Sequence, residues 1–190
     1  MNDIKIYLVK ISGKIEESIF RYLLGFIRED KKERILMQGT KQNADNMLIG
    51  EILTKVAIKM NFDIDIKEQK IACSKYGKPY LTDYPNAHFN ISHSGNYVAC
   101  AVSDKPVGTD IQKIGKYCSD TAKRVCSEEE LKQISDSSDK ASEFTRLWTQ
   151  KEAVLKMCGT GFISDNVKNC LDNKSVQSRR VGDYWLSISC

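Results

Sequence analysis

The sequence has no long apolar segment. No hydrophobic run among its 190 residues approaches the length of roughly 20 residues that a transmembrane helix needs. The start, MNDIKIYLVKI, does not place a long apolar run after a basic beginning, so no secretory signal peptide is expected. We therefore expect no membrane contact.

Paired cysteines are also missing. The seven cysteines are odd in number, and no two of them form a CxxC motif. This spacing excludes a ribbon-type zinc site and argues against a disulfide framework. Reduced thiols are typical of the cytosol, so a cytoplasmic location is expected.

Charge of one sign is present only in slight excess. The 29 basic and 25 acidic residues give a net charge of +4. This excess suits an anionic ligand or an acidic partner. Nucleic acid is not expected, because the basic residues form no stripe interleaved with aromatic side chains.

Hydrophobic periodicity predicts strands and helices in two successive groups. The predicted strands cover residues 4–11, 64–74, 88–94, 97–103 and 107–112, and a final pair covers 175–180 and 183–189. The predicted helices cover residues 14–28, a stretch opening within 28–34, 43–60, a segment opening at 127, and 138–158. Residues 76–86 are predicted as a loop, because Gly77, Pro79 and Pro85 interrupt them. This order favours two α+β lobes, residues 1–105 and 106–190, without a sequence repeat between them.

Two candidate binding positions lie in the first group. Lys78 stands between Gly77 and Pro79, so it is either a fixed phosphate contact or a solvated loop lysine. His93, beside Ser92 at a strand end, could donate to phosphate, act as a base, bind metal or be purely structural. No GxSxG motif is present, which excludes the hydrolase elbow.

A metal site shared by the two histidines is not expected. His88 precedes His93 by five residues on the same predicted strand. An odd separation places two strand side chains on opposite faces of the sheet.

Acidic candidates lie in the second group. Asp110 sits within an apolar strand, and Gln112 on the same face offers an amide oxygen to a hard cation. Trp148, Glu152 and Lys156 share one face of a predicted helix. Each acid alone could form an ordinary ion pair. Together with the basic positions, they have the chemistry of a site for Mg²⁺-bridged pyrophosphate.

The ordered segments GKPY, FNISHSG, GTDIQ and WTQKEAVLKMCGTGF resemble the signatures of the 4′-phosphopantetheinyl transferases. The layout resembles the surfactin-synthetase type, with two lobes in one chain, rather than the small trimeric acyl-carrier-protein synthase type. The resemblance covers roughly residues 1–165 and is densest over 76–162. It implies an α+β pseudo-dimer whose active site lies in the cleft between two similar lobes.

The resemblance also implies a reaction. Coenzyme A (CoA) donates its 4′-phosphopantetheine arm to a serine of an apo acyl or peptidyl carrier protein, and adenosine 3′,5′-bisphosphate is released. Mg²⁺, or alternatively Mn²⁺, is the implied cofactor. We expect a monomer with CoA and an acidic carrier protein as its partners.

Specific residues match the family's functional positions. Asp110 and Glu152 fall on its metal ligands, with Gln112 as a third candidate. Glu152 is also the implied general base, Lys156 contacts phosphate and assists the leaving group, and Asp110 completes the catalytic set. The implied CoA contacts are Lys31, Arg34, Lys78, Ser92, His93 and Lys156, with His93 at the 3′-phosphate.

The sequence departs from the common family pattern at two places. Gln112 stands where many members have glutamate, which leaves two carboxylates for the metal. Asn46 and Met47 stand where many members have an Arg-Thr pair that contacts the 3′-phosphate. An alternative hypothesis is therefore a catalytically impaired relative that binds CoA or carrier protein.

Overall fold

The computed structural model describes residues 4–161 and 167–190. Phe162, the last residue of the WTQKEAVLKMCGTGF motif, and the end of the resembling region lie outside the described residues. Helices and antiparallel sheets alternate along the chain, which confirms the mixed α+β class. Among the described residues, no helix combines the length and apolar character needed to cross a membrane.

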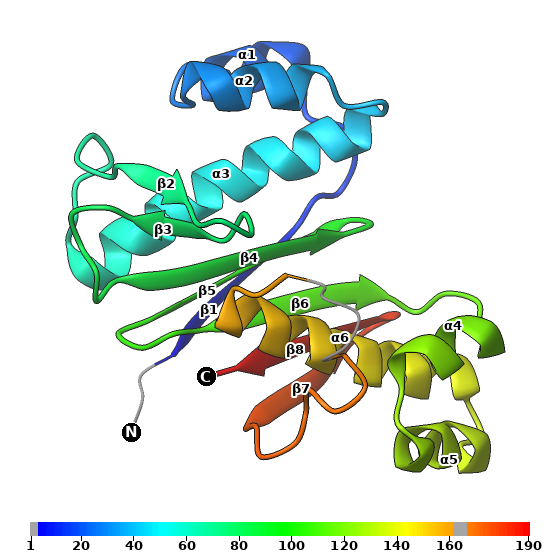
Figure 1. The fold of residues 1–190 in the computed structure, drawn as a ribbon. Helices are drawn as coiled ribbons and strands as arrows, with labels where there is room; N and C mark the ends of the chain where they lie inside the picture. Colours follow the sequence, from blue (N-terminus) through cyan, green and yellow to red (C-terminus); the bar gives the residue numbers. More distant parts are fainter. Residues whose placement is uncertain (1–3, 162–166) are drawn as a thin grey trace.

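The first half of the chain builds one sheet with helices on one side (Figure 1). The sheet has the antiparallel order β1-β5-β4, with strands Lys5–Lys10, Tyr97–Ser103 and His88–Ser94. Helix α3 (Lys41–Phe62) lies on this sheet, and α1 (Glu17–Leu24) and α2 (Glu29–Leu36) cover α3. A small hairpin of β2 (Ile71–Cys73) and β3 (Pro79–Leu81) flanks them.

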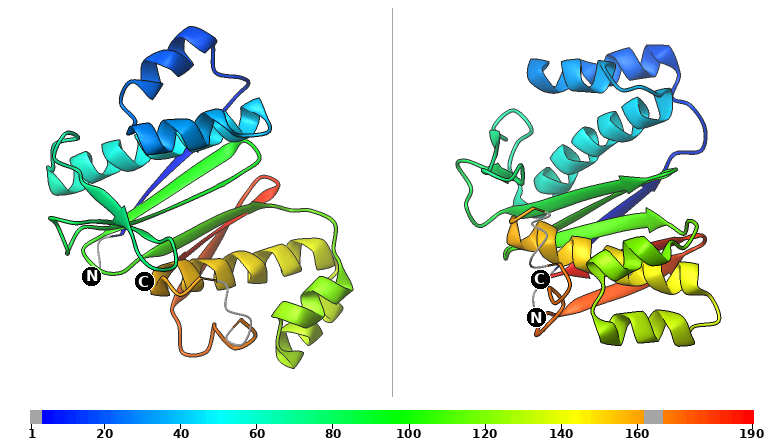
Figure 2. Two further views of the ribbon diagram at one scale, coloured as in Figure 1. Left: turned by 45° about the horizontal axis from the view of Figure 1, so that its top comes forward. Right: turned by 45° about the vertical axis from the view of Figure 1, so that its right-hand side comes forward.

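The second half builds another three-stranded antiparallel sheet, with the order β6-β8-β7 (Figure 2). Its strands are Gly108–Lys113, Tyr184–Ser189 and Val176–Val181. Helix α6 (Lys140–Cys158) packs along this sheet, and α4 (Ser119–Val125) and α5 (Glu128–Asp136) lie near its N-terminal end.

Local capping signals define the helix ends. The Thr40 hydroxyl accepts from the amide of Asn43 at the start of α3. Ser127 followed by Glu130 three residues later is the spacing that predicts a capping box, and the two residues form one at the start of α5. Gly159 ends α6 in the left-handed conformation, with φ of +67°. The capping box of α5 and the glycine at the end of α6 are local signals, so the sequence predicts both.

The predicted helix over 14–28 is too long, and its buried face is partly wrong. Helix α1 ends at Leu24. The helical periodicity of residues 14–28 predicts an apolar stripe of Ile15, Ile19, Leu23 and Phe26. Ile19 and Phe26 are instead about half exposed, whereas Phe20 and Ile27 are buried. The chain turns at residue 25, so residues on either side of this break do not follow a single helical period.

Two strand boundaries also differ from the prediction. The 64–74 segment forms a strand only at 71–73, and the predicted loop 76–86 contains β3. Pro79 is the first residue of β3, a position where proline is tolerated because it removes no essential ladder bond. Helix α4 lies between residues 112 and 127, where the sequence favours helix without giving its bounds.

Side chains of β4 join the two sheets. Strand β6 pairs with β8 along one edge only, so the backbone amides on the other edge of β6 need hydrogen-bond acceptors from elsewhere. Polar residues at every second position of β4 accept from these amides. The bonds join Thr109 N to Asn90 Oδ1 (2.8 Å), Ile111 N to Ser92 Oγ (3.3 Å) and Lys113 N to Ser94 Oγ (3.1 Å). We call this set the β4–β6 ladder.

A fully buried lysine anchors α6. The Lys151 ammonium lies 2.8 Å from a carboxylate oxygen of Glu130 and donates to the carbonyls of Val167 and Lys168 at 2.9 and 2.8 Å. The other Glu130 oxygen accepts from the Ser127 amide within the capping box. A buried charge needs such complete pairing, and the pairing fixes α5 against α6.

Gly108 allows α6 to approach β6 closely. A Cβ atom at this position would overlap the carbonyl oxygen of Ala153 and the backbone nitrogen of Met157. Both atoms belong to the backbone of α6, so neither can rotate aside. The absence of a side chain therefore brings α6 into contact with β6.

Replacing Gly108 by alanine is expected to destabilise the protein by about 1–3 kcal/mol, the usual cost of overpacking. The added methyl group would push α6 away from β6. Chemical denaturation compared with Gly115→Ala is the appropriate measurement, because a Cβ at Gly115 meets no atom within 4 Å. Equal stability of the two variants would contradict this role for Gly108.

Candidate functional site

Asp110 is a buried carboxylate near the middle of β6. The residue is 5 % exposed. Oδ1 accepts from the Ser92 hydroxyl at 2.7 Å and from the Lys156 ammonium at 2.5 Å. Oδ2 is buried, and no group in the described part of the chain bonds to it. A buried oxygen without a partner is costly, and so it marks a place where a ligand would be stabilised.

Helix α6 brings Glu152 and Lys156 to Asp110. The two residues are one turn apart, and the close packing at Gly108 sets their distance from β6. Burial raises the pKa of Glu152, the negative charge of Asp110 raises it further, and Lys156 opposes both. Two carboxylates and one ammonium therefore share a small volume.

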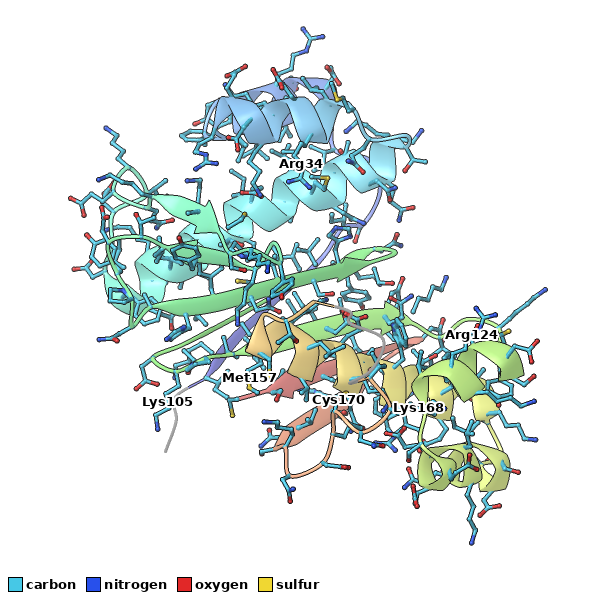
Figure 3. All side chains as sticks on the ribbon, in the orientation of Figure 1. Arg34, Lys105, Arg124, Met157, Lys168 and Cys170 are labelled. Atoms are coloured by element: carbon cyan, nitrogen blue, oxygen red, sulfur yellow. The ribbon has the colours of Figure 1, made fainter. Side chains whose placement is uncertain are left out.

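A cavity of about 360 Å³ opens beside this group. Five of the residues predicted for the site line it, namely Lys31, Arg34, Lys78, Glu152 and Lys156. The cavity thus contacts α2, the segment before β3, and α6. Figure 3 labels Arg34 on α2, which lies across β4 from Met157 near the end of α6.

One end of the cavity is basic and holds a carboxylate that the sequence did not reveal. Lys31 Nζ lies 2.8 Å from a carboxylate oxygen of Glu51, and each side chain is about one-fifth exposed. Burial lowers the pKa of the nearby Lys55, and the negative charge of Glu51 partly offsets this shift. Arg34 is exposed at this end. In the sequence, Glu51 stands only within the predicted helix 43–60, because 20 residues separate it from Lys31.

Lys78 is more constrained than an ordinary loop lysine. Its ammonium donates to the carbonyl of Met157 at 2.6 Å and to that of Val107 at 3.3 Å. Its aliphatic stem lies against Gly159. Burial lowers its pKa. Lys78 therefore binds the C-terminal end of α6, where a cation is favoured by the helix dipole, and also lines the cavity.

Comparison with known proteins agrees with this geometry. A family model described as 4′-phosphopantetheinyl transferase superfamily matches residues 106–188, and one described as 4′-phosphopantetheinyl transferase, N-terminal, matches residues 14–105. The chain is 32 % identical over 186 residues to 4′-phosphopantetheinyl transferase Sfp of Bacillus subtilis (strain 168). That alignment covers 97 % of this chain and 81 % of the relative.

The chain belongs to the 4′-phosphopantetheinyl transferase superfamily. A second Bacillus subtilis 4′-phosphopantetheinyl transferase is 33 % identical over 159 residues, covering 83 % of this chain and 71 % of the relative. The chain is also 27 % identical over 173 residues to the L-aminoadipate-semialdehyde dehydrogenase-phosphopantetheinyl transferase of Saccharomyces cerevisiae. That alignment covers 84 % of this chain and 64 % of the relative. These matches confirm the surfactin-synthetase type and the enzyme class expected from the motifs.

The two histidines of this phosphopantetheinyl transferase lie in different surroundings. His93 is exposed, yet neighbouring atoms desolvate part of its ring, which lowers its pKa; Lys156 lowers it further and Asp110 opposes this. Burial also lowers the pKa of His88, as does Lys78. The structure therefore places only His93 beside the Asp110–Lys156 pair.

Gln112 does not line the cavity that contains Glu152. It is exposed and contributes to a second cavity of about 180 Å³ together with Phe144, Thr145 and Trp148. Its position two residues after Asp110 on β6 still places both side chains on one face of the strand. Whether it binds the metal stays a prediction.

Asn46 forms a hydrogen bond to the turn between β4 and β5. It is 2 % exposed, and its Nδ2 donates to the carbonyl of Gly95 at 2.9 Å. Its Oδ1 is buried and has no partner among the described residues. Asn46 therefore holds the hairpin that ends β4, close in sequence to Ser92 and His93.

The donor groups present here fit a hard divalent cation. Asp110 offers an unpartnered buried oxygen, and Glu152 adds a half-buried carboxylate whose pKa responds to Asp110. Mg²⁺ is commonly bound by one or two carboxylates together with phosphate oxygens and water. Within residues 4–161 and 167–190, no group of three or more His, Cys, Asp or Glu side chains is arranged to hold a metal ion.

Proposed function

We propose that this protein transfers the 4′-phosphopantetheine arm of CoA to a serine of an apo acyl or peptidyl carrier protein and releases adenosine 3′,5′-bisphosphate. The observation that carries this proposal is the cavity whose lining includes Lys31 and Arg34 at its basic end as well as Glu152 and Lys156. Lys156 in turn donates to Asp110. Such a cavity suits a polyanion whose reacting phosphate lies next to carboxylates.

The proposed architecture is a pseudo-dimer of two α+β lobes, residues 1–105 and 106–190, with the active site in the cleft between them. Two three-stranded sheets, each packed against one long helix, support it. The cavity lining supports it as well, because residues of α2 and α3 face residues of α6.

Binding of CoA would use the cations around the cavity. Lys31 and Arg34 would hold phosphate at the basic end, Lys78 would contact the nucleotide, and His93 the 3′-phosphate. A charge-assisted hydrogen bond to phosphate is stronger than a neutral one, so these contacts would fix the reacting phosphorus near Glu152.

Asp110 and Glu152 would hold Mg²⁺ or Mn²⁺, with Gln112 as a further candidate ligand. When bound, the ion would neutralise pyrophosphate oxygens and favour attack on the phosphorus. Glu152, directly or through water, would take the proton of the carrier serine. Lys156 would donate to the phosphate oxygens that gain negative charge as the bond to adenosine bisphosphate breaks.

The proposed setting is a cytoplasmic monomer. The net charge of +4 suits an acidic carrier protein. No nucleic-acid or membrane role is proposed. An impaired relative that binds CoA or carrier protein without transfer is the second candidate, favoured by Gln112 and Asn46 at two positions where many family members differ.

A mass measurement on the carrier protein tests the proposal. Incubation with CoA, Mg²⁺ and several apo carriers is expected to add one phosphopantetheine to the carrier serine. A chelator, or a carrier with that serine changed to alanine, should prevent the addition. Absence of any addition across acyl and peptidyl carriers would reject the enzyme, and CoA binding without transfer would favour the impaired relative.

A further inference from the structure

The hydroxyl of Ser92 is fully occupied within the protein. It donates to Asp110 Oδ1 at 2.7 Å, and it accepts from Lys156 Nζ at 3.2 Å and from Ile111 N at 3.3 Å. A serine hydroxyl has one hydrogen to donate and two lone pairs to accept with. Ser92 is also 7 % exposed, so in this arrangement it has no remaining capacity for a ligand.

These bonds determine which oxygen of Asp110 stays available. Ser92 and Lys156 both donate to Oδ1, while Oδ2 remains buried and unpartnered within the described structure. The Ile111 amide belongs to the β4–β6 ladder and holds the Ser92 oxygen opposite Asp110. The ladder therefore sets the orientation of the carboxylate.

We propose that Ser92 is a positioning residue, which acts on the reaction through Asp110 and Lys156 rather than through a contact with CoA. It keeps Oδ2 free for the divalent cation and aligns the Lys156 ammonium toward the same centre. This inference rests on the proposed transferase function, and it assigns Ser92 a different role from the CoA contact that family resemblance implies.

Loss of the hydroxyl would remove this orientation. In Ser92→Ala, the Lys156 ammonium would become the remaining donor to Asp110, and the carboxylate could rotate to present either oxygen to it. Removing the outer partner of a metal ligand commonly lowers metal affinity or activity by about 10- to 100-fold. Binding of CoA in the absence of metal should stay unchanged, because no phosphate contact is lost.

Ser94 provides a matched control. It lies on the same strand, two residues on, and its hydroxyl accepts from the Lys113 amide at 3.1 Å. Ser94→Ala therefore removes one bond of the same ladder without changing the partners of Asp110. Ser92→Thr keeps the hydroxyl, and its branched side chain is suited to a strand.

The test measures three quantities for wild type, Ser92→Ala, Ser92→Thr and Ser94→Ala. These are CoA affinity by calorimetry with a chelator present, Mn²⁺ affinity by electron paramagnetic resonance at saturating CoA, and transfer rate to an apo carrier. For Ser92→Ala we expect unchanged CoA affinity, roughly 10-fold weaker Mn²⁺ binding and a transfer rate about 10- to 100-fold lower. Ser92→Thr should recover most of both losses, and Ser94→Ala should match wild type.

Two outcomes would overturn the inference. Weaker CoA binding by Ser92→Ala without metal would show that Ser92 contacts the substrate directly. Equal Mn²⁺ affinity in Ser92→Ala and Ser94→Ala would show that the hydroxyl does not orient Asp110. Failure of wild type to transfer would reject the proposed function, while the two binding measurements would still decide the role of Ser92.

Discussion

Replacing Glu152 by glutamine is expected to slow phosphopantetheine transfer by roughly 100- to 10,000-fold, the usual contribution of a positioned general base. Glutamine keeps the size of the side chain but cannot accept the serine proton, and it removes one of the two carboxylates proposed to hold the cation. Initial rates, followed by the mass of the carrier protein, measure this loss.

Glu143→Gln is the matched control for this variant. Glu143 lies on the same helix, where it pairs with Arg146 at 2.5 Å, and it does not line the cavity. We expect Glu143→Gln to transfer at the wild-type rate. If Glu152→Gln kept a rate close to that of this control, Glu152 could not be the base.

Stability should change in the opposite direction to activity. The pKa of Glu152 is raised in the folded protein, so folding favours its protonated form. That stabilising contribution is present below the ordinary pKa of 4.5 and is lost as the pH rises through the higher folded pKa. At neutral pH without metal, Glu152→Gln should therefore be at least as stable as wild type, and any advantage should shrink as the pH falls toward 4.5. A less stable variant at neutral pH would mean that the attraction between the Glu152 carboxylate and the Lys156 ammonium outweighs the cost of burying the carboxylate.

Features that depend on neighbours in sequence were predictable. The Ser127–Glu130 capping box, the turn at Gly95 and the end of α6 at Gly159 each depend on a few adjacent residues. The resemblance to the family motifs singles out Asp110 and Lys156, and the structure brings these two side chains into direct contact.

Features that depend on distant contacts were not predictable. Asp110 and Ser92 lie on different sheets, and their contact requires the β4–β6 ladder to set the register. Lys151 and Glu130 are separated by a helix boundary, and charge alone does not reveal that this lysine is fully buried. The apolar pattern around α1 was misleading for the same reason, because packing on α3 decides which residues are buried.

Replacing Asp110 by asparagine is expected to lower the transfer rate by at least about 100-fold. Loss of even an outer partner of a metal ligand lowers activity by up to about this factor, and Asp110 is proposed as a ligand itself. The side chain keeps its shape but loses its charge. If its oxygen stays with Ser92 and Lys156, an NH₂ group replaces Oδ2 and faces the proposed cation. If it flips, the NH₂ group meets the Lys156 ammonium, and both groups are donors.

Asp110→Asn should also lose stability, unlike Glu152→Gln. Lys156 would lose its charged partner in a partly buried site, and a charge-assisted hydrogen bond of this kind contributes about 1.5–3 kcal/mol, less where solvent reaches the pair. Denaturation and transfer assays in parallel, with the exposed Asp136→Asn as control, separate the two effects. A tenfold excess of Mg²⁺ should not restore the rate, because the lost oxygen belongs to the site itself. A variant as active and as stable as Asp136→Asn would show that the buried Oδ2 of Asp110 serves neither the cation nor the fold.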